Sequence, residues 1–432
     1  HMSICLEKIK HFYSYKYATY YFKIGVFLLL SAPAISVIFL LPSIIISLRQ
    51  RKESFLKEKL NFCLIITAIF MIISCIHNSY PINFPYDSWS PSLSWYGLIN
   101  WIPLFIFYFG FKSFLKTSKE RRQISLLFIF GTIPLLTSGI LQYFFKIYGP
   151  FETLNGLVIW FSRSLGPDEG LTGLFNNPNY AGAWLSLVFP FSLALCQEKR
   201  SQTTKIISYF ICTTIVFVSI FTFSRSSLIN IGLGSIFTSY KSIIFSIVPL
   251  ILLIVFLLPI CYLGFNFSNQ ISLLKKLFIN RFCLNFELIS LTNSHRIIIW
   301  SNALQLLKDK YIFGYGASSF STIYSDRMCN ELKECLRFTT HAHNILIEIA
   351  INYGLIASIL LAIFVSILLY KGFKKIYIKK NSFRIKDNFD KAWWTSIFVI
   401  TLSHLYDNQY YDLRISISSW ILLAGLSNII KE

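Results

Sequence analysis

The residues of this sequence that could do chemistry are arginines and histidines that lie where long apolar runs begin or end. Arg225 lies in the polar stretch TFSRSS at 222–227, and Arg296 opens the segment RIIIW at 296–300. A guanidinium group stays charged at any working pH and binds phosphate oxygens through paired hydrogen bonds. Both arginines are therefore candidates for binding an anion. For Arg225 the alternative is an interfacial arginine that reaches along the membrane surface without a specific partner.

His343 is the candidate for proton transfer, because it lies next to Asn344 at the start of an apolar run. A neutral imidazole at an interface can accept the proton of an attacking hydroxyl. The structural alternative is a histidine at a helix entry that hydrogen-bonds to the backbone. His341 lies two residues earlier, and the two histidines together could supply half of the ligands of a metal site. The sequence pairs no obvious third or fourth ligand with them. We therefore expect no metal and no cofactor.

Several other polar residues lie close to these positions in the sequence. Glu348 follows five residues after His343 inside the apolar run, where a buried carboxylate needs a partner, so it could orient the site or hold a neighbouring helix. Asn177 and Pro178 predict the start of a helix, with the asparagine as its cap. The further candidates for contact with a substrate are Arg163, Arg414, His341, Asn344, Glu348 and Asn179.

The composition of the chain indicates a membrane protein. Hydrophobic residues make up 54% of the 432 positions, charged residues make up only 14%, and the mean hydropathy is +0.57. Apolar runs of about 20 residues match a bilayer core of roughly 30 Å. We therefore predict an all-α polytopic membrane protein, since a β-barrel would show short alternating segments instead.

The net charge of +20 does not indicate binding of nucleic acid. Lys and Arg occur in short strips between apolar runs, which is typical of cytoplasmic loops. No basic domain or base-stacking module accompanies these strips. The sequence also lacks a Walker loop, a GxGxxG motif after a strand and a GxSxG elbow, so we expect no use of ATP by this chain.

The alternation of basic strips and apolar runs predicts about twelve membrane segments, with both termini in the cytoplasm. The first apolar run is too short for two full spans, so we expect a hairpin of two short helices at 18–31 and 34–48, broken near Pro33. One kinked span is the alternative. The further segments are expected at 61–77, 98–115, 123–147, 178–196, 205–222, 226–239, 242–264, 343–369, 392–405 and 414–430.

These segments divide the chain into three parts. The N-terminal bundle at 1–264 holds the first nine segments, one large periplasmic loop with helices occupies 265–342, and the C-terminal segments lie at 343–432. This topology puts the four arginines named above, with His341, His343 and His404, on the outer side, where arginine is scarce. Cys329 and Cys335 lie in the loop, either as a local disulfide or as two free thiols.

Three motifs occur in order along the chain. They are FSRSS at 223–227, then RIIIW at 296–300 followed by GYG at 314–316, then HN at 343–344 followed by Glu348 and Gly354. Together they resemble the O-antigen ligase and Wzy-type O-antigen polymerase superfamily, most specifically over 294–356. The NPN at 177–179 also matches the superfamily, whereas the first two segments do not align with it.

The resemblance implies a multi-pass transferase of the bacterial inner membrane that acts in lipopolysaccharide biosynthesis, with its active site facing the periplasm. Such enzymes move a glycan from undecaprenyl pyrophosphate to an acceptor hydroxyl, with inversion and without a metal. By position in the motifs, Arg225 and Arg296 would bind the pyrophosphate and His343 would be the general base. A ligase uses a sugar of the lipid A core as acceptor, and a polymerase uses a second lipid-linked glycan.

Three alternatives to an O-antigen ligase remain at this point. The first is the polymerase, which shares the donor and the base with the ligase. The second is a transporter of a small anion such as bicarbonate, which Glu348 favours most. A transporter needs polar residues at mid-depth along a path through the membrane, whereas here they gather on one face. The third, a purely structural scaffold, would leave the outer arginines unexplained.

Overall fold

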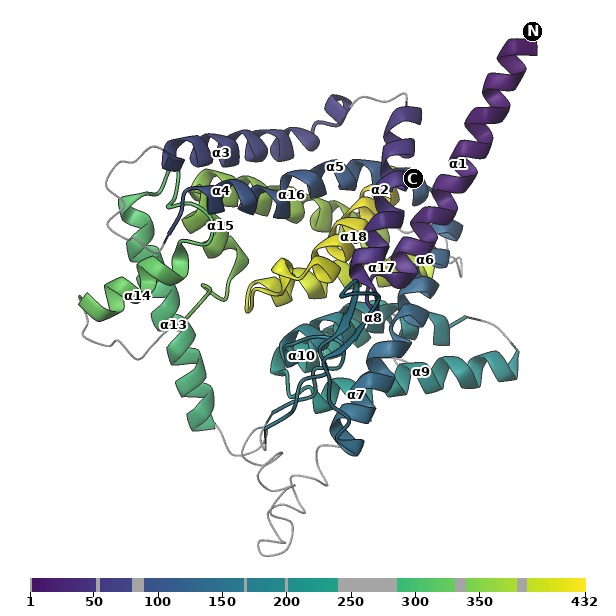
Figure 1. The fold of residues 1–432 in the computed structure, drawn as a ribbon. Coiled ribbons are helices and arrows are strands. Elements are labelled where there is room, and N and C mark those ends of the chain that lie inside the picture. Colours follow the sequence, from purple (N-terminus) through teal and green to yellow (C-terminus); the bar gives the residue numbers. More distant parts are fainter. Residues whose placement is uncertain are drawn as a thin grey trace, which may run out of the picture.

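The computed structural model describes residues 2–51, 55–79, 89–166, 169–198, 201–239, 286–330, 339–378 and 387–432 (Figure 1). Strands occur in these ranges only as one short antiparallel hairpin, β1 (Phe151–Thr153) with β2 (Val158–Trp160). Within the same ranges, eight helical stretches are long and apolar enough to cross a membrane. The predicted all-α polytopic membrane fold is therefore confirmed.

The membrane-length stretches are single helices or helices joined by a short break. They are α2 (Pro33–Gln50), α3 (Asn61–Ser79), α4 (Ser92–Gly97) with η2 (Leu98–Asn100), α5 (Ile102–Phe111) and η3 (Lys112–Phe114), α6 (Ser118–Gly131) with α7 (Ile133–Phe145), α8 (Pro178–Cys196), α9 (Gln202–Phe221), α16 (Leu355–Phe373) with η5 (Lys374–Ile378), and α18 (Leu413–Lys431). The other helices are α1 (Met2–Leu28), η1 (Phe55–Lys57), α10 (Arg225–Thr238), α13 (Phe286–Asp309), α14 (Phe320–Asn330), α15 (Ile345–Tyr353), α17 (Asp387–His404) and η6 (Gln409–Tyr411). The segment expected at 242–264 lies outside the described residues.

The first two helices form a pair that packs along its length. Residues 29–32 separate them, and α2 starts at Pro33, which suits the first turn of a helix because the missing N–H would have no partner there. The Ser36 hydroxyl donates a hydrogen bond of 2.7 Å to the Gly25 carbonyl. A Cβ at Gly25 would overlap the Leu40 side chain, so the glycine allows this close approach. α1 begins at Met2, well before the expected start at 18.

The apolar run expected as one segment at 343–369 is two helices, which corrects that expectation. α15 ends at Tyr353 and α16 begins at Leu355, with Gly354 between them at φ +96°. This backbone conformation favours glycine, and a Cβ there would collide with the Ile312 carbonyl. The break therefore exists because the segment 310–316 packs against the end of α15.

Two helices form the centre of the bundle. In their apolar, membrane-length parts, 89% of the residues of α8 and 83% of those of α18 are buried. α8 packs against α10, α17 and α9. A helix that is apolar on all sides belongs in the interior of a bundle, whereas one lipid-facing side remains exposed on α2, α3 and α16. α8 and α18 are therefore surrounded by other parts of the protein, and they hold the loops at both ends of the bundle in fixed positions.

Figure 1 shows how the two ends of the bundle differ. α3, α5, α9 and α16 run across the view, and α13, α14 and α15 lie below the left-hand ends of α3 and α16. Both chain termini lie on the opposite side. We call the end with α13–α15 and the loop 405–412 the site end. We call the other, which carries Arg51, Lys112, Arg121 and Lys431, the basic end.

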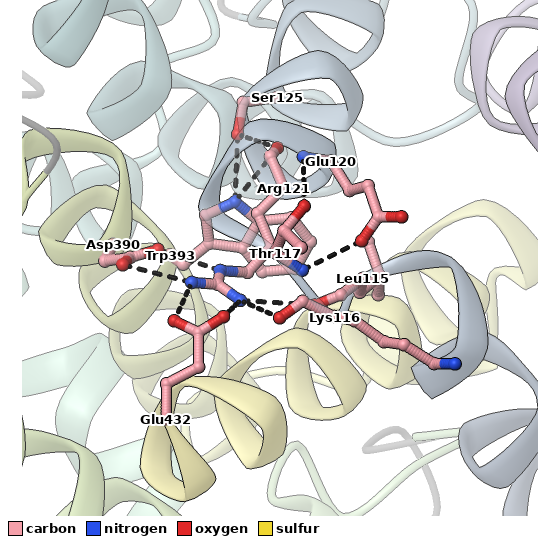
Figure 2. A network of polar contacts seen from close by, with 9 residues as sticks. All are labelled: Leu115, Lys116, Thr117, Glu120, Arg121, Ser125, Asp390, Trp393 and Glu432. Atoms are coloured by element: carbon pink, nitrogen blue, oxygen red, sulfur yellow. Dashed lines mark hydrogen bonds and ion pairs between the residues drawn. The ribbon is translucent and has the colours of Figure 1, made fainter.

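A buried ion network ties the basic end together (Figure 2). The Arg121 side chain is fully buried, and its guanidinium contacts Asp390 of α17 and Glu432 after α18, each at 2.8 Å. It also donates to the carbonyls of Leu115 and Lys116. Five donors of one guanidinium can satisfy several acceptors at once. The network therefore joins α6, α17 and the end of α18.

Candidate functional site

The site end brings His343 and Asp407 together. Asp407 follows α17 in the loop before η6, and its Oδ1 lies 3.0 Å from Nδ1 of His343. The His343 side chain is 34% exposed and the Asp407 side chain only 10%. His343 has a left-handed backbone at φ +49°, an uncommon conformation for a residue with a side chain that is held here by its surroundings. The imidazole is thus anchored on one nitrogen and open on its other side.

Asp407 is itself held by three hydrogen bonds. Its Oδ2 accepts from the Asn179 amide at 3.0 Å, and its Oδ1 accepts from the backbone N–H of Asn408 at 2.8 Å as well as facing His343. Burial would raise the pKa of Asp407, but the hydrogen bonds from His343 and Asn408 and the positive charge of Arg296 together lower it below its ordinary value. The carboxylate is therefore ionised at neutral pH.

An ionised Asp407 sets the tautomer of a neutral His343. The carboxylate can only accept, so Nδ1 carries the hydrogen and Nε2 carries the free lone pair. This assignment follows from the hydrogen-bond network. The arrangement gives the site a base nitrogen whose ring is oriented by a fixed, charged partner.

The residues next to His343 hold its backbone in place. Asn344 caps α15 by accepting from the N–H groups of Leu346 and Ile347, and its amide donates to the Leu405 carbonyl at 3.1 Å. This last bond ties the start of α15 to the loop that carries Asp407. Asn344 is thus a helix cap that sets the distance between the two loops.

The RIIIW motif acts on the same loop from α13. The Trp300 indole donates to the Ala342 carbonyl at 2.9 Å, directly before His343. Arg296 lies four residues earlier, so both side chains share one face of the helix. Arg296 is half-buried, and its charge is close enough to Asp407 to lower the pKa of that carboxyl. One helical turn therefore supplies both a backbone anchor and a cation.

His341 and Glu348 form a second pair beside the first. Glu348 is buried, accepts from the backbone N–H of Ala342 at 2.8 Å, and lies 3.9 Å from Nδ1 of His341. The negative charge of this carboxylate raises the pKa of His341. The two histidines thus have different carboxylate partners. Glu348 has a partner on both oxygens, so it braces the loop.

Arg225 lies at the start of α10, where its side chain is exposed. It forms no hydrogen bond or ion pair with any other residue that the structure describes. The first turn of α10 packs on the first turn of α8, because the Ser227 hydroxyl donates to the Gly182 carbonyl at 2.8 Å. Asn179, which contacts Asp407, lies in that same turn of α8. Arg225 is therefore an exposed cation at the site end, one helix away from the His343–Asp407 pair.

The other two outer arginines have protein partners. Arg163 pairs with Glu169 at 2.6 Å and donates to the Asn176 carbonyl, and its side chain is 38% exposed. Arg414 is buried, contacts both oxygens of Asp412, donates to the Leu174 carbonyl and lies 3.8 Å over the Phe175 ring. These contacts hold the segment before α8 in place. They leave the Arg414 guanidinium little capacity for a substrate.

An apolar pocket of about 160 Å³ adjoins the pair. Its walls include Ile345 and Leu346, which follow the His343 loop, and Leu405 and Tyr410, which flank Asp407 in the other loop. The buried His404 also lines it. The loops that carry His343 and Asp407 thus border an apolar space between α15, α16, α17 and α18. Such a combination suits a ligand with a polar head and a lipid tail.

The fold and the site define a multi-pass membrane protein with a polar site at one end of its bundle. Residues 207–362 match the family model of the O-antigen ligase. The matched region runs from α9 into α16 and includes Arg225, Arg296 and His343. The resemblance seen in the motifs is thereby confirmed, and the match supports a membrane enzyme of the ligase or polymerase type. Comparison with curated proteins gives no match.

Asp407 is the residue of this site that the sequence does not single out. A signal exists, because an aspartate in a short stretch between two apolar runs needs a partner in the same way that Glu348 does. The positions that could supply that partner lie 64 and 228 residues away, at His343 and Asn179. Spacing along the chain cannot reveal such pairs. Cys335 lies outside the described residues, as does the Cys329 side chain.

Proposed function

We propose that this protein transfers a glycan from undecaprenyl pyrophosphate to an acceptor hydroxyl at the periplasmic face of the bacterial inner membrane. The observation that carries the proposal is the His343–Asp407 pair, whose Nδ1 and Oδ1 atoms lie 3.0 Å apart near the charge of Arg296. His343 and Arg296 lie within the region that matches the O-antigen ligase, and Asp407 lies outside it. A base with a charged orienting partner and a nearby cation suits attack by a hydroxyl on a carbon that carries a phosphate leaving group.

In the proposed reaction the acceptor oxygen forms a bond to the anomeric carbon as the bond from that carbon to the diphosphate oxygen breaks. The proton of the acceptor hydroxyl passes to Nε2 of His343. The electron pair of the broken bond leaves with the diphosphate, where Arg225 and Arg296 stabilise the developing charge. Attack from the side opposite the leaving group inverts the configuration. Asp407 stabilises the imidazolium that forms.

The remaining residues of the site have supporting roles in this proposal. Asn179 orients Asp407, while Asn344, Trp300 and Glu348 fix the His343 loop. Arg163 and Arg414 brace the segment before α8 instead of binding pyrophosphate. The apolar pocket beside the pair takes the first part of the polyprenyl chain. All groups that the chemistry requires come from side chains, so we propose that the reaction needs no metal.

The proposed membrane orientation follows from charge. The basic end carries Arg51, Lys112, Arg121 and Lys431, and such an excess of cations is typical of the cytoplasmic side. The site end then faces the periplasm, where a lipid-linked glycan would be presented. A bicarbonate-type transporter receives less support, because Glu348 already has the backbone of Ala342 and His341 as partners.

Glycan profiling of cells tests this function. Cells that lack the gene are complemented with the wild type, His343→Ala or Asp407→Asn, and their surface glycans are compared. We expect both variants to fail to complement although they accumulate in the membrane. Loss of all glycan on the lipid A core identifies a ligase, and loss of chain length alone identifies a polymerase. Full complementation by both variants would contradict the proposed site.

A further inference from the structure

An apolar groove opens on the lipid-facing side of the bundle, away from the site end. It has a volume of about 410 Å³ and lies between α3 on one side and α2 and α5 on the other. Its walls include Ala68 and Ile72 of α3 and Ile102, Phe105 and Phe109 of α5. The lining side chains are all apolar, and several of them, such as Ile69 and Ile106, are exposed along its rim.

The groove has the length of one lipid leaflet. Its α3 wall runs from Leu64 to Ile72, which corresponds to about 12 Å at 1.5 Å per helical residue. Half of a bilayer core is about 15 Å thick. One end of the groove, at Ile102, lies near the middle of the membrane-length stretch from α4 to η3. The other end of the groove, at Leu48 and Phe55, lies at the basic end of the bundle. It therefore occupies the leaflet on the side of the basic end.

A cationic cluster closes the groove at that end. The Arg51 guanidinium lies 3.8 Å over the ring of Phe109, a wall residue of the groove, and donates to its carbonyl at 2.6 Å. Glu58 lies 3.7 Å from Arg51 and 2.6 Å from both Lys112 and Lys431. One carboxylate thus faces three cations. The Arg51 side chain is 14% exposed and the Lys431 side chain 48% exposed, so both charges reach the surface.

We propose that this groove is a binding site for an anionic phospholipid. One acyl chain lies in the groove between α3 and α5, and the phosphate lies at Arg51 and Lys431. The charge of the cluster favours a headgroup that carries a net negative charge over a zwitterionic one. The length of the groove favours a lipid of the cytoplasmic leaflet over the polyprenyl donor, whose proposed site is at the other end.

A lipid in this groove would support the candidate site through α3. The last turns of α3 hold the turn 313–316, because the Ser74 hydroxyl and the Asn78 amide both contact the Phe313 carbonyl. The turn 313–316 also packs on the end of α15, where the Tyr315 N–H donates to the Ile351 carbonyl at 2.7 Å. Filling the gap beside α3 would therefore keep the helix that braces α15 in its place.

Native mass spectrometry of the full chain in detergent tests the proposal. The protein is titrated with phosphatidylglycerol and with phosphatidylethanolamine of the same acyl chains. We expect phosphatidylglycerol to bind at least about fivefold more tightly, which corresponds to one favourable cationic contact. Arg51→Gln removes this preference, and Arg49→Gln, an exposed arginine two residues away, keeps it. Equal affinity for the two lipids would overturn the proposal.

A second pair of variants tests the groove itself. Ala68→Phe fills it from the α3 wall, and Ile66→Phe adds a ring at an exposed position nearby that does not line it. We expect Ala68→Phe to lose tight binding of phosphatidylglycerol and Ile66→Phe to retain it, with both variants unfolding near the wild-type temperature. Where Arg51→Gln fails to fold, Lys431→Gln replaces it. Equal binding of phosphatidylglycerol by the two phenylalanine variants would overturn the proposal. A wild-type dimer that Ala68→Phe dissociates would show that this surface binds a second copy of the chain, and would overturn it too.

Discussion

The Asp407 side chain explains why one histidine among several is suited to be a base. Its carboxylate is buried and ionised, and it accepts from Asn179, from the Asn408 backbone and from His343. A neutral histidine without such a partner would divide its hydrogen between two nitrogens and rotate freely. The hydrogen bond of 3.0 Å selects one tautomer and one ring orientation.

We expect Asp407→Asn to lower kcat by about 10²- to 10⁴-fold, because the imidazolium formed during transfer loses its charged partner. KM for the lipid-linked donor should change little, since the arginines proposed to hold the diphosphate are intact. The measurement is steady-state transfer by the purified protein. Asp412→Asn is the matched control: Asp412 pairs with Arg414, so this change should lower thermal stability and leave kcat near the wild-type value. A wild-type kcat for Asp407→Asn would refute the role of the pair.

The His341–Glu348 pair should make stability depend on pH. Glu348 raises the pKa of His341 above its ordinary value of about 6.5, so the charged histidine stabilises the folded state. This contribution is fully present below pH 6.5 and is lost as the pH rises through the folded-state pKa. The difference in unfolding temperature between the wild type and His341→Gln should thus be larger at pH 5.5 than at pH 9. A difference that does not vary with pH would contradict this account.

Residue type and position single out part of the candidate site from the sequence alone. His343 and Arg296 are recognisable because a histidine and an arginine at the ends of apolar runs are costly without a purpose. Asp407 and its contacts are not recognisable, because the partner positions lie far apart along the chain. For Arg414 the sequence misleads instead. Its position predicts a guanidinium available to a substrate, but that guanidinium already pairs with Asp412, two residues earlier.

Among the helices, the break between α15 and α16 has the largest effect on the site. It lets α15 be a short helix that starts at the His343 loop, while α16 continues as a membrane span. The segment 310–316 fits into the break, with Leu355 N–H donating to the Tyr311 carbonyl at 2.8 Å. The position of α15 therefore depends on a contact that only glycine at 354 permits.

We expect Gly354→Ala to destabilise the protein by about 2 kcal/mol or more, because the new Cβ meets the Ile312 carbonyl at a left-handed backbone position. Transfer activity should fall as well, since α15 carries the His343 loop. The measurement is thermal unfolding in detergent together with the transfer rate. Gly232→Ala is the control, because a Cβ there meets nothing within 4 Å. An equal response of the two variants would argue against the proposed strain.

Hydropathy predicts the membrane helices well and their interruptions poorly. The expected segments at 61–77, 178–196 and 414–430 correspond to α3, α8 and α18. The run at 343–369 reads as one segment, because apolar residues continue through Gly354 and only the packed segment 310–316 shows why the helix ends. The hairpin of β1 and β2 carries no strong signal either: its strands are three residues long.

Across the whole chain, polar side chains gather at both ends of the bundle with different purposes. At the site end, His343 contacts Asp407 through Nδ1, and its Nε2 has no partner among the residues that the structure describes. At the basic end Arg121 is fully buried and surrounded by Asp390, Glu432 and two carbonyls (Figure 2). A satisfied network of this kind joins α6, α17 and the end of α18. The placement of Lys and Arg along the chain predicts the orientation of the bundle, but only the packing shows which of these cations are structural.

We expect Arg121→Met to destabilise the protein by about 2 kcal/mol, because it removes the common partner of two carboxylates. Both carboxylates keep some contact with water, which limits the loss. Arg122→Met is the control: Arg122 is 29% exposed and pairs with Glu198, so its loss should cost under about 1 kcal/mol. Thermal unfolding measures both, and kcat should stay near the wild-type value. Equal unfolding temperatures for the two variants would contradict the structural role of Arg121.

The proposed transfer can be followed with purified protein, a glycan-loaded undecaprenyl pyrophosphate and an acceptor, by measuring release of undecaprenyl pyrophosphate in excess EDTA. The wild type should release it under these conditions. His343→Gln should be slower by about 10²-fold or more, because the imidazole proposed to take the proton is gone, and its affinity for the donor should stay within about twofold. Release by His343→Gln at the wild-type rate, or loss of wild-type activity in EDTA, would contradict a metal-independent reaction with His343 as its base.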